Sequence, residues 1–219
     1  MSNAKASILN KLKQQVAGAD TDKLPMEQPY QYPALSPADK IALFVNHLEK
    51  NQAQVIKLDR ANISEVINQE LNARDIDQLL YAPKGQYAKD IAPCATNIKL
   101  TPYDFEFSAN KERLFYQTPA AVTGSRCAIA HTGTIVLWPS IEEPRTLSLV
   151  PPVHFVIVDA QTLYQTFDEV IAQQQWKNGL PTNVVLVSGP SKTADIQQTL
   201  AYGAHGPKAL IVLLYNTST

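Results

Sequence analysis

The chain has 219 residues, 45% of them hydrophobic and 18% charged, which is enough apolar material for one packed core and excludes a disordered chain. Its 19 basic and 20 acidic residues give a formal net charge of -1, and no basic run alternates with aromatic residues, so we expect no nucleic-acid partner. No apolar stretch is long enough to span a bilayer and no apolar signal segment opens the chain, so we expect a soluble, cytoplasmic protein without a membrane partner.

The first 50 residues predict two helices separated by a linker. Apolar residues at helical spacing over residues 7–16 predict an amphipathic helix that could dock on its own domain or on another chain. Residues 19–37 carry four prolines and two tyrosines, which favours an extended linker. Ser36 followed by proline is a typical helix start. We therefore expect an N-terminal helix and Pro-rich linker over residues 1–36 and one domain over residues 37–219.

The rest of the chain alternates predicted strands and helices. The predicted strands at 153–158 and 183–187 consist almost entirely of Val, Ile, Leu and Phe. Such sequences are typical of strands buried on both faces of a parallel sheet. This pattern predicts an α/β, Rossmann-like fold with a mostly parallel sheet flanked by helices and an N-terminal helical extension. Strands are expected at residues 54–58, 78–81, 120–123, 127–130, 134–138, 153–158, 183–187 and 210–214, and helices at 37–50, 64–72, 161–177 and 193–201.

Open parallel sheets bind ligands at the carboxyl ends of their strands, in the loops that follow them. On that ground we expect the chemistry of the chain to lie on residues 123–154 and 183–207. Residues 83–112 give mixed signals, and we place nothing functional there.

One candidate site is the segment Ser188-Gly189-Pro190-Ser191-Lys192-Thr193, which follows a predicted strand and opens a predicted helix. Backbone N–H groups and the helix dipole favour an anion at such a position. The segment has neither P-loop nor GxGxxG spacing, so nucleotide hydrolysis and hydride transfer do not follow from it. The alternative is that Ser191 or Thr193 simply caps the helix and Asp195 compensates its dipole.

A second candidate is the turn His131-Thr132-Gly133-Thr134, which places two hydroxyls and an imidazole between two apolar strands. The alternative is an ordinary hairpin turn, for which glycine and threonine are common residues. The guanidinium of Arg145 is suited to bind a carboxylate or phosphate through two parallel hydrogen bonds. The alternative is that Arg145 forms a surface ion pair with the neighbouring glutamates. If the chain is an enzyme, His131 or Glu143 is the best available general base.

The metal-binding residue types do not form a site in the sequence. His131, His154 and His205 show no helical pairing, and Cys94 and Cys127 lie far apart with no CxxC motif. Cys127 also lies in an apolar strand, where burial disfavours a thiolate nucleophile. We therefore expect neither a metal nor a cofactor in this chain.

Three segments, AIAHTGTIVLWPS, RTLSLVPPVHFVIV and SGPSKTADIQQTLAYGAHGPKALIVLLY, resemble the LUD-domain family in order and spacing. The resemblance covers roughly residues 80–215, and the size of the chain is similar to the lactate utilization protein C branch. It implies a NagB/RpiA/CoA-transferase-like fold and a role beside iron-sulfur partner subunits that oxidise L-lactate to pyruvate. In the AETGT turn of the family this chain has His131 where an acidic residue is usual.

Two functions remain open from the sequence. The first is an accessory subunit of an iron-sulfur complex that oxidises L-lactate, without activity alone and with iron-sulfur clusters only in its partner subunits. The second is a free-standing isomerase, transferase or cyclo-ligase acting on a phosphorylated or carboxylated small molecule. In the first, a small anion or nucleotide would bind a crevice lined by Thr132, Gly133, Thr134, Arg145, Ser188, Gly189, Ser191, Lys192 and Thr193.

Overall fold

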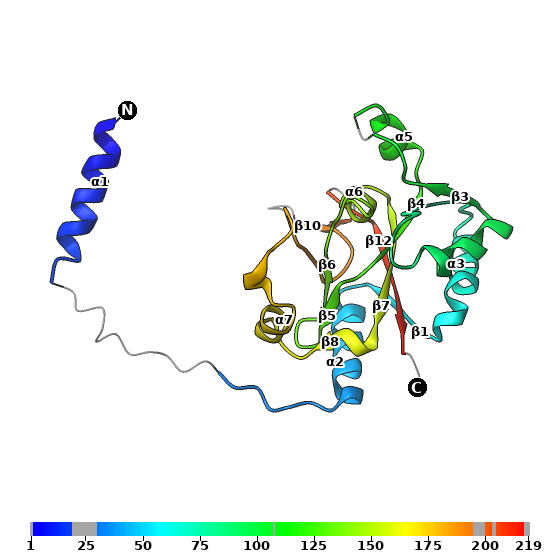
Figure 1. Ribbon diagram of the computed structural model, residues 1–219, viewed down its shortest axis with the longest axis horizontal. Helices are drawn as coiled ribbons and strands as arrows, with labels where there is room; N and C mark the ends of the chain where they lie inside the picture. Colours follow the sequence, from blue (N-terminus) through cyan, green and yellow to red (C-terminus); the bar gives the residue numbers. More distant parts are fainter. Residues whose placement is uncertain (1, 19–29, 107, 195–199, 203–204, 217–219) are drawn as a thin grey trace. The chain divides into compact units, whose positions relative to one another are not determined.

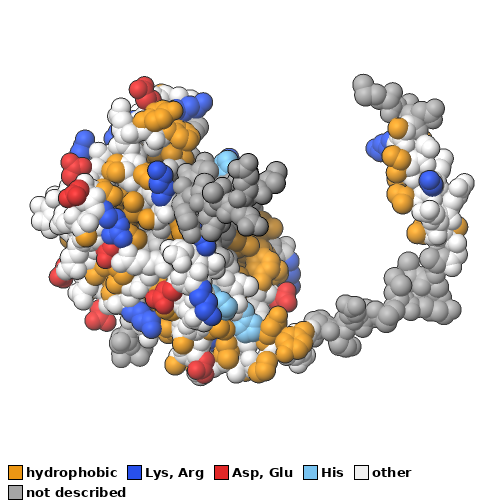
Figure 2. Space-filling model, turned by 180° about the vertical axis from the view of Figure 1, so that it is seen from behind, with side chains coloured by type: hydrophobic (Ala, Val, Ile, Leu, Met, Phe, Trp, Pro, Cys, Tyr) orange, Lys and Arg blue, Asp and Glu red, His pale blue; other side chains and the backbone are white. Residues whose placement is uncertain are grey.

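The computed structural model of the protein describes residues 2–18, 30–106, 108–194, 200–202 and 205–216. The chain divides into two compact units, Met1–Pro33 and Ala34–Thr219. The first unit contains α1 (Ser2–Gln15), which begins earlier than the helix expected from the sequence. Its apolar side chains are exposed within the described residues, and Figure 2 shows them at the surface of the helix beside its lysines.

The second unit is built on a six-stranded sheet in which every pairing is parallel. Its spatial order is β1-β12-β7-β4-β2-β3. In the central register Phe155 lies between Val122 on one side and Ile211 on the other. The bounds are β1 (Gln54–Leu58), β2 (Gln78–Tyr81), β3 (Lys99–Pro102), β4 (Ala120–Gly124), β7 (Val153–Asp159) and β12 (Ala209–Tyr215).

Both faces of this sheet are buried, because alternate side chains of β7 and β12 belong to different apolar clusters. Phe155 and Ile157 pack with α3 (Ile63–Asn72) on one face. Val156 and Val158 pack with α2 (Pro37–Lys50) on the other. Figure 1 shows these two helices on opposite sides of the sheet. The N-cap of α2 is as expected, since the side chain of Ser36 accepts the N–H of Asp39.

A second sheet of four short strands lies on the α2 side, in the order β8-β5-β6-β9. Its outer face packs against Val170 of α7 (Phe167–Gln173). Its strands are β5 (Cys127–Ile129), β6 (Thr134–Leu137), β8 (Leu163–Tyr164) and β9 (Val185–Val187). The remaining elements are α4 (Ala88–Ile91), α5 (Lys111–Tyr116), α6 (Thr146–Leu149), β10 (Lys192–Ala194), β11 (Leu200–Tyr202) and short 3-10 turns at Arg60–Asn62, Ala92–Thr96, Ala160–Thr162 and Trp176–Asn178.

The α/β class and the mostly parallel sheet are confirmed, but three element predictions are wrong. The helix expected over 193–201 is not present at its described ends, because β10 pairs antiparallel with β11, with Lys192 opposite Tyr202, and residues 195–199 lie outside the described residues. The predicted helix over 161–177 is reduced to α7, preceded by a 3-10 turn and β8. β9 is not a buried parallel strand, because it pairs antiparallel with β6 and leaves Leu186 49% exposed. Within the described ranges, no helix is long and apolar enough to cross a membrane.

Candidate functional site

The strand order of the parallel sheet reverses between β2 and β4. From β2 the chain moves outward to β3, then returns to the other side of β2 and continues through β4, β7 and β12. Between β2 and β4 the register contains one residue pair, Leu80 with Ala121. In open parallel sheets, the loops on either side of such a reversal separate at the carboxyl ends of the strands and leave a crevice.

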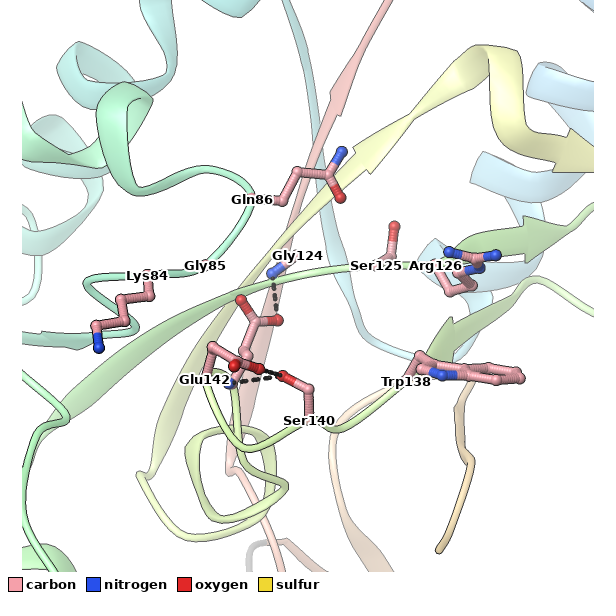
Figure 3. A pocket seen from close by; sticks show the side chains of 10 residues that line it. Lys84, Gly85, Gln86, Gly124, Ser125, Arg126, Trp138, Ser140 and Glu142 are labelled. Atoms are coloured by element: carbon pink, nitrogen blue, oxygen red, sulfur yellow. Dashed lines mark hydrogen bonds between the residues drawn. The ribbon is translucent and has the colours of Figure 1, made fainter. Parts of the chain in front are cut away.

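A pocket of about 280 Å³ lies at this reversal point (Figure 3). Three segments form it: the loop after β2, the residues that end β4 and follow it, and the loop after β6. Most of its side chains are polar, with the ring of Trp138 as an apolar wall. The lining residues are Lys84, Gly85, Gln86, Gly124, Ser125, Arg126, Trp138, Ser140, Glu142 and Glu143.

Glu143 is fixed in the lining of this crevice by its backbone and by one carboxylate oxygen. Its Oε1 accepts the backbone N–H of Gly124 at 2.9 Å, and its own backbone N–H donates to the Ser140 hydroxyl at 3.0 Å. The second oxygen, Oε2, lies against Gly85, where a Cβ atom would be only 2.9 Å away. A Cβ atom at Gly124 would lie 2.8 Å from the ring of Tyr87. Gly85 therefore permits the close approach of the carboxyl group, and Gly124 that of the Tyr87 ring.

The two neighbouring glutamates of the crevice have opposite electrostatic surroundings. Burial raises the pKa of Glu143 to about 7, with the Gly124 N–H partly opposing the shift. Hydrogen bonds from its own backbone N–H and from the Ser140 hydroxyl lower the pKa of Glu142. In the described part of the chain, no cation lies within ion-pair distance of Glu143. Near pH 7 the crevice therefore holds one ionised carboxyl group and one that is about half protonated, an arrangement typical of acid-base and ligand-binding sites.

Two exposed cations flank the opening of the crevice. The guanidinium of Arg126 lies over the ring of Trp138, 5.6 Å from its centroid, and its Nε donates to the side-chain oxygen of Gln174 at 2.6 Å. Lys84 extends from the loop after β2 on the opposite side (Figure 3). Arg126 is thus held in a defined orientation, while Lys84 contributes a positive charge at the rim.

The sequence-predicted turn at Thr132–Thr134 and Ser188 are brought together, but outside the crevice. The hydroxyl of Thr134 lies 2.7 Å from that of Thr132 and 2.8 Å from that of Ser188. Gly133 has φ +57°, and a Cβ atom there would collide with His47 of α2. The three hydroxyls thus hydrogen-bond to one another while the turn packs on α2.

His131, one of the two general-base candidates, lies in the same turn. Its backbone N–H donates to the carbonyl of Gln165, and its Nε2 is 3.4 Å from the side-chain nitrogen of that residue. His131 is not among the residues that line the crevice. Of the two candidate bases, the structure places only Glu143 there.

The other predicted ligand residues are divided between two places. Ser188, Gly189 and Ser191 line a separate, mostly apolar pocket of about 200 Å³ beside His154 and His205. Exposed Arg145 lines a narrow recess next to Glu143. Lys192 is exposed on β10, and the side chain of Thr193 lies outside the described residues. Because the described residues 192–194 form a strand where a helix was expected to begin, no helix N-terminus is described at this segment to favour an anion.

His154 is the one fully buried histidine of the second pocket. Its Nε2 lies 2.9 Å from the Thr123 hydroxyl, and burial lowers its pKa to about 3. Its imidazole is therefore neutral at physiological pH.

The cysteines do not supply a reactive group in this structure. Both are buried, and burial raises the pKa of Cys94 to about 11 and that of Cys127 to about 12. Among the residues that the structure describes, no three His, Cys, Asp or Glu side chains gather closely enough to hold a metal ion.

Most of the crevice was missed by the sequence reasoning. Gly124, Ser125 and Arg126 fall in the 123–154 segment that was expected to carry chemistry, but they were not singled out. Lys84, Gly85 and Gln86 fall in the region where nothing functional was placed. One signal was available, because a Pro-Lys-Gly-Gln sequence begins one residue after the strand predicted at 78–81.

The comparisons with known proteins agree on one family. Residues 41–215 match the model of the LUD domain. An uncharacterized protein of Neisseria meningitidis serogroup B is 36% identical over 96% of this chain and 93% of its own length. Lactate utilization protein C of Bacillus subtilis is 25% identical over 80% of this chain and 78% of its own, and Lactate utilization protein C 1 of Bacillus mycoides is 26% identical over 80% and 79%.

A solved structure supports the fold alone. A DUF162 family protein from Deinococcus radiodurans superposes with a TM-score of 0.62 at 22% sequence identity. The match covers 83% of this chain and 99% of that one. The fold of the second unit is thus shared by a protein whose sequence has diverged widely.

Proposed function

Because this chain belongs to the LUD-domain family, we propose that it is a lactate utilization protein C-type accessory subunit of a cytoplasmic iron-sulfur complex that oxidises L-lactate to pyruvate. The electrons would pass through iron-sulfur clusters of its partner subunits. Both cysteines of this chain are buried and separate, and their raised pKa values keep them as thiols, which are poor cluster ligands. The part of this chain is to bind a small anionic ligand in the crevice between β2 and β4.

The observation that carries the ligand-binding role is the position of the crevice. It lies at the strand-order reversal of a parallel sheet, where such folds bind ligands. Arg126 and Lys84 at its rim attract an anion, and Arg126 is already oriented by Trp138 and Gln174. The cluster of Thr132, Thr134 and Ser188 is a poorer candidate, because its hydroxyls bind each other.

A second candidate function is supported by Glu143. A carboxyl group with a pKa of about 7 in a ligand-sized crevice is suited to general acid-base catalysis. This favours the free-standing isomerase, transferase or cyclo-ligase type of enzyme, acting on a phosphorylated or carboxylated small molecule. His131 does not line the crevice, so it has no role in this proposed enzyme.

Reconstitution separates the two functions. We expect L-lactate-dependent reduction of an artificial electron acceptor when the chain is mixed with cysteine-rich iron-sulfur subunits, and none from the chain alone. In the mixture, Arg126→Ala should lower the rate about tenfold, because a charge-assisted hydrogen bond contributes about 1.5 to 3 kcal/mol.

Lys192→Ala is the matched control, since that lysine is exposed and outside the crevice. Loss of activity only with Lys192→Ala would assign the anion site to the segment 188–193 instead. Lactate oxidation by the isolated chain would contradict the accessory role. Turnover of a phosphorylated or carboxylated compound by the isolated chain would establish the second candidate.

A further inference from the structure

We propose that Glu143 binds the crevice ligand as a neutral carboxylic acid, donating a hydrogen bond from Oε2 to an oxygen of a small monoanionic carboxylate. This inference rests on the proposed ligand-binding role of the crevice and names the chemistry of its ligand. It assigns the protein a site that takes up a proton when it binds. Three sets of observations support it.

The first is the geometry of the two carboxyl oxygens. Oε1 accepts the N–H of Gly124, so a proton on the group belongs on Oε2. No hydrogen bond of the described residues uses Oε2, which lies against Gly85, another residue that lines the crevice. A protonated carboxyl group has one O–H donor, and an anionic oxygen in the crevice is its natural acceptor.

The second is the set of charged and titratable groups around Glu143. Lys84 comes from the loop after β2, and Arg126 from the segment after β4, where the side chain is held by Trp138 and Gln174. Glu142, in the same loop as Glu143, is ionised and hydrogen-bonded to Ser140.

Two further groups complete these surroundings. Tyr87 packs on Gly124, and burial raises the pKa of its hydroxyl, which stays neutral. Arg145, in the adjoining recess, is exposed and forms no described ion pair with Glu143. Among the described residues, no charge therefore holds Glu143 in its ionised form.

The third is the small net positive charge of the rim. Two exposed cations and one ionised glutamate leave about one positive charge for the ligand, which suits a monoanion. A second negative charge would lie beside Glu142 without a further cation to balance it. The crevice volume of about 280 Å³ fits a compound of a few carbon atoms.

Calorimetric titration of the full chain tests this with sodium L-lactate, pyruvate, acetate and inorganic phosphate as probes. Each titration is run at pH 6 and pH 8 in buffers of different ionisation enthalpy, which gives the number of protons taken up. We expect at least one carboxylate to bind with uptake approaching one proton at pH 8 and little uptake at pH 6. Affinity should fall about tenfold per pH unit above about 7, because the binding form of Glu143 becomes rarer.

Three variants identify the group responsible. Glu143→Gln keeps a neutral donor, so it should bind at pH 8 at least as tightly as the wild type, without proton uptake or pH slope. Glu143→Ala should bind about tenfold more weakly at pH 6, because the donor is lost. Glu142→Gln removes a neighbouring carboxylate that is already ionised, so the pH slope should remain.

Binding without proton uptake at pH 8, a pH slope that survives in Glu143→Gln, or no binding of any carboxylate would overturn the inference. Binding of phosphate alone would overturn the assignment to a carboxylate. These outcomes are independent of partner assembly. A chain that binds carboxylates as described but adds nothing to iron-sulfur subunits would retain the inference and lose the accessory role.

Discussion

Glu143 is also expected to control how the stability of the fold depends on pH. Below its ordinary pKa of 4.5 the carboxyl group is protonated in both the folded and the unfolded chain and has no effect. Between that value and about 7 the unfolded chain releases the proton first, so the free energy of unfolding falls as the pH rises. Above about 7 the loss is constant, at most about 3 kcal/mol.

Glu143→Gln removes this titration, so its stability relative to the wild type should increase by up to about 3 kcal/mol between pH 4.5 and pH 8. Urea unfolding at a series of pH values measures the difference. Glu142→Gln is the control, because the pKa of Glu142 is lowered and its replacement should bring no such gain. A Glu143→Gln effect that is the same at both pH values would contradict the burial argument.

At the scale of elements, the β5–β6 turn is fixed by its contact with α2. Gly133 has a positive φ of +57°, which costs alanine and most other residues about 1 to 2 kcal/mol. A Cβ atom there would also collide with His47 and lie 3.1 Å from the backbone nitrogen of Leu48. We therefore expect Gly133→Ala to lower the free energy of unfolding by at least about 2 kcal/mol.

Gly179→Ala is the matched control for this substitution. Gly179 also has a positive φ, +149°, but no heavy atom lies within 4 Å of a Cβ atom built there. Chemical denaturation of the two variants measures backbone strain without a side-chain clash at Gly179, and left-handed strain plus the α2 contact at Gly133. If Gly133→Ala loses no more than about 1 to 2 kcal/mol, the cost expected of a left-handed φ alone, the turn does not depend on α2, and the glycine is only a hairpin residue.

At the scale of the molecule, the crevice and its supporting core belong entirely to the second unit. All lining residues and the packed faces of the sheet lie after residue 33. A chain of residues 34–219 should therefore unfold within about 2 °C of the full chain, a difference below about 1 kcal/mol for a domain of this size. Differential scanning calorimetry measures this, and a much lower midpoint would show that the first unit supports the core.

The sequence determined the positions of most strands, because runs of Val, Ile and Leu favour strand conformation locally and exclude water on both faces. The bounds expected for β1, β2, β4, β7 and β12 agree with the structure to within one residue at each end. The three segments that resemble the LUD-domain family also determined the family, since they keep the order and spacing that the family has. Within the crevice, the sequence singled out Glu143 as a candidate base.

The tertiary structure decided which strands are neighbours and therefore where the crevice lies. The pairing of β2 with β4 joins residues some 40 positions apart, a long-range choice that local patterns do not encode. Strand pairing also decided two other elements. β9 pairs with β6 in the second sheet, and β10 pairs with β11 where a helix was expected to begin. The pKa of Glu143 depends on burial against Gly85 and Gly124, which only the assembled loops provide.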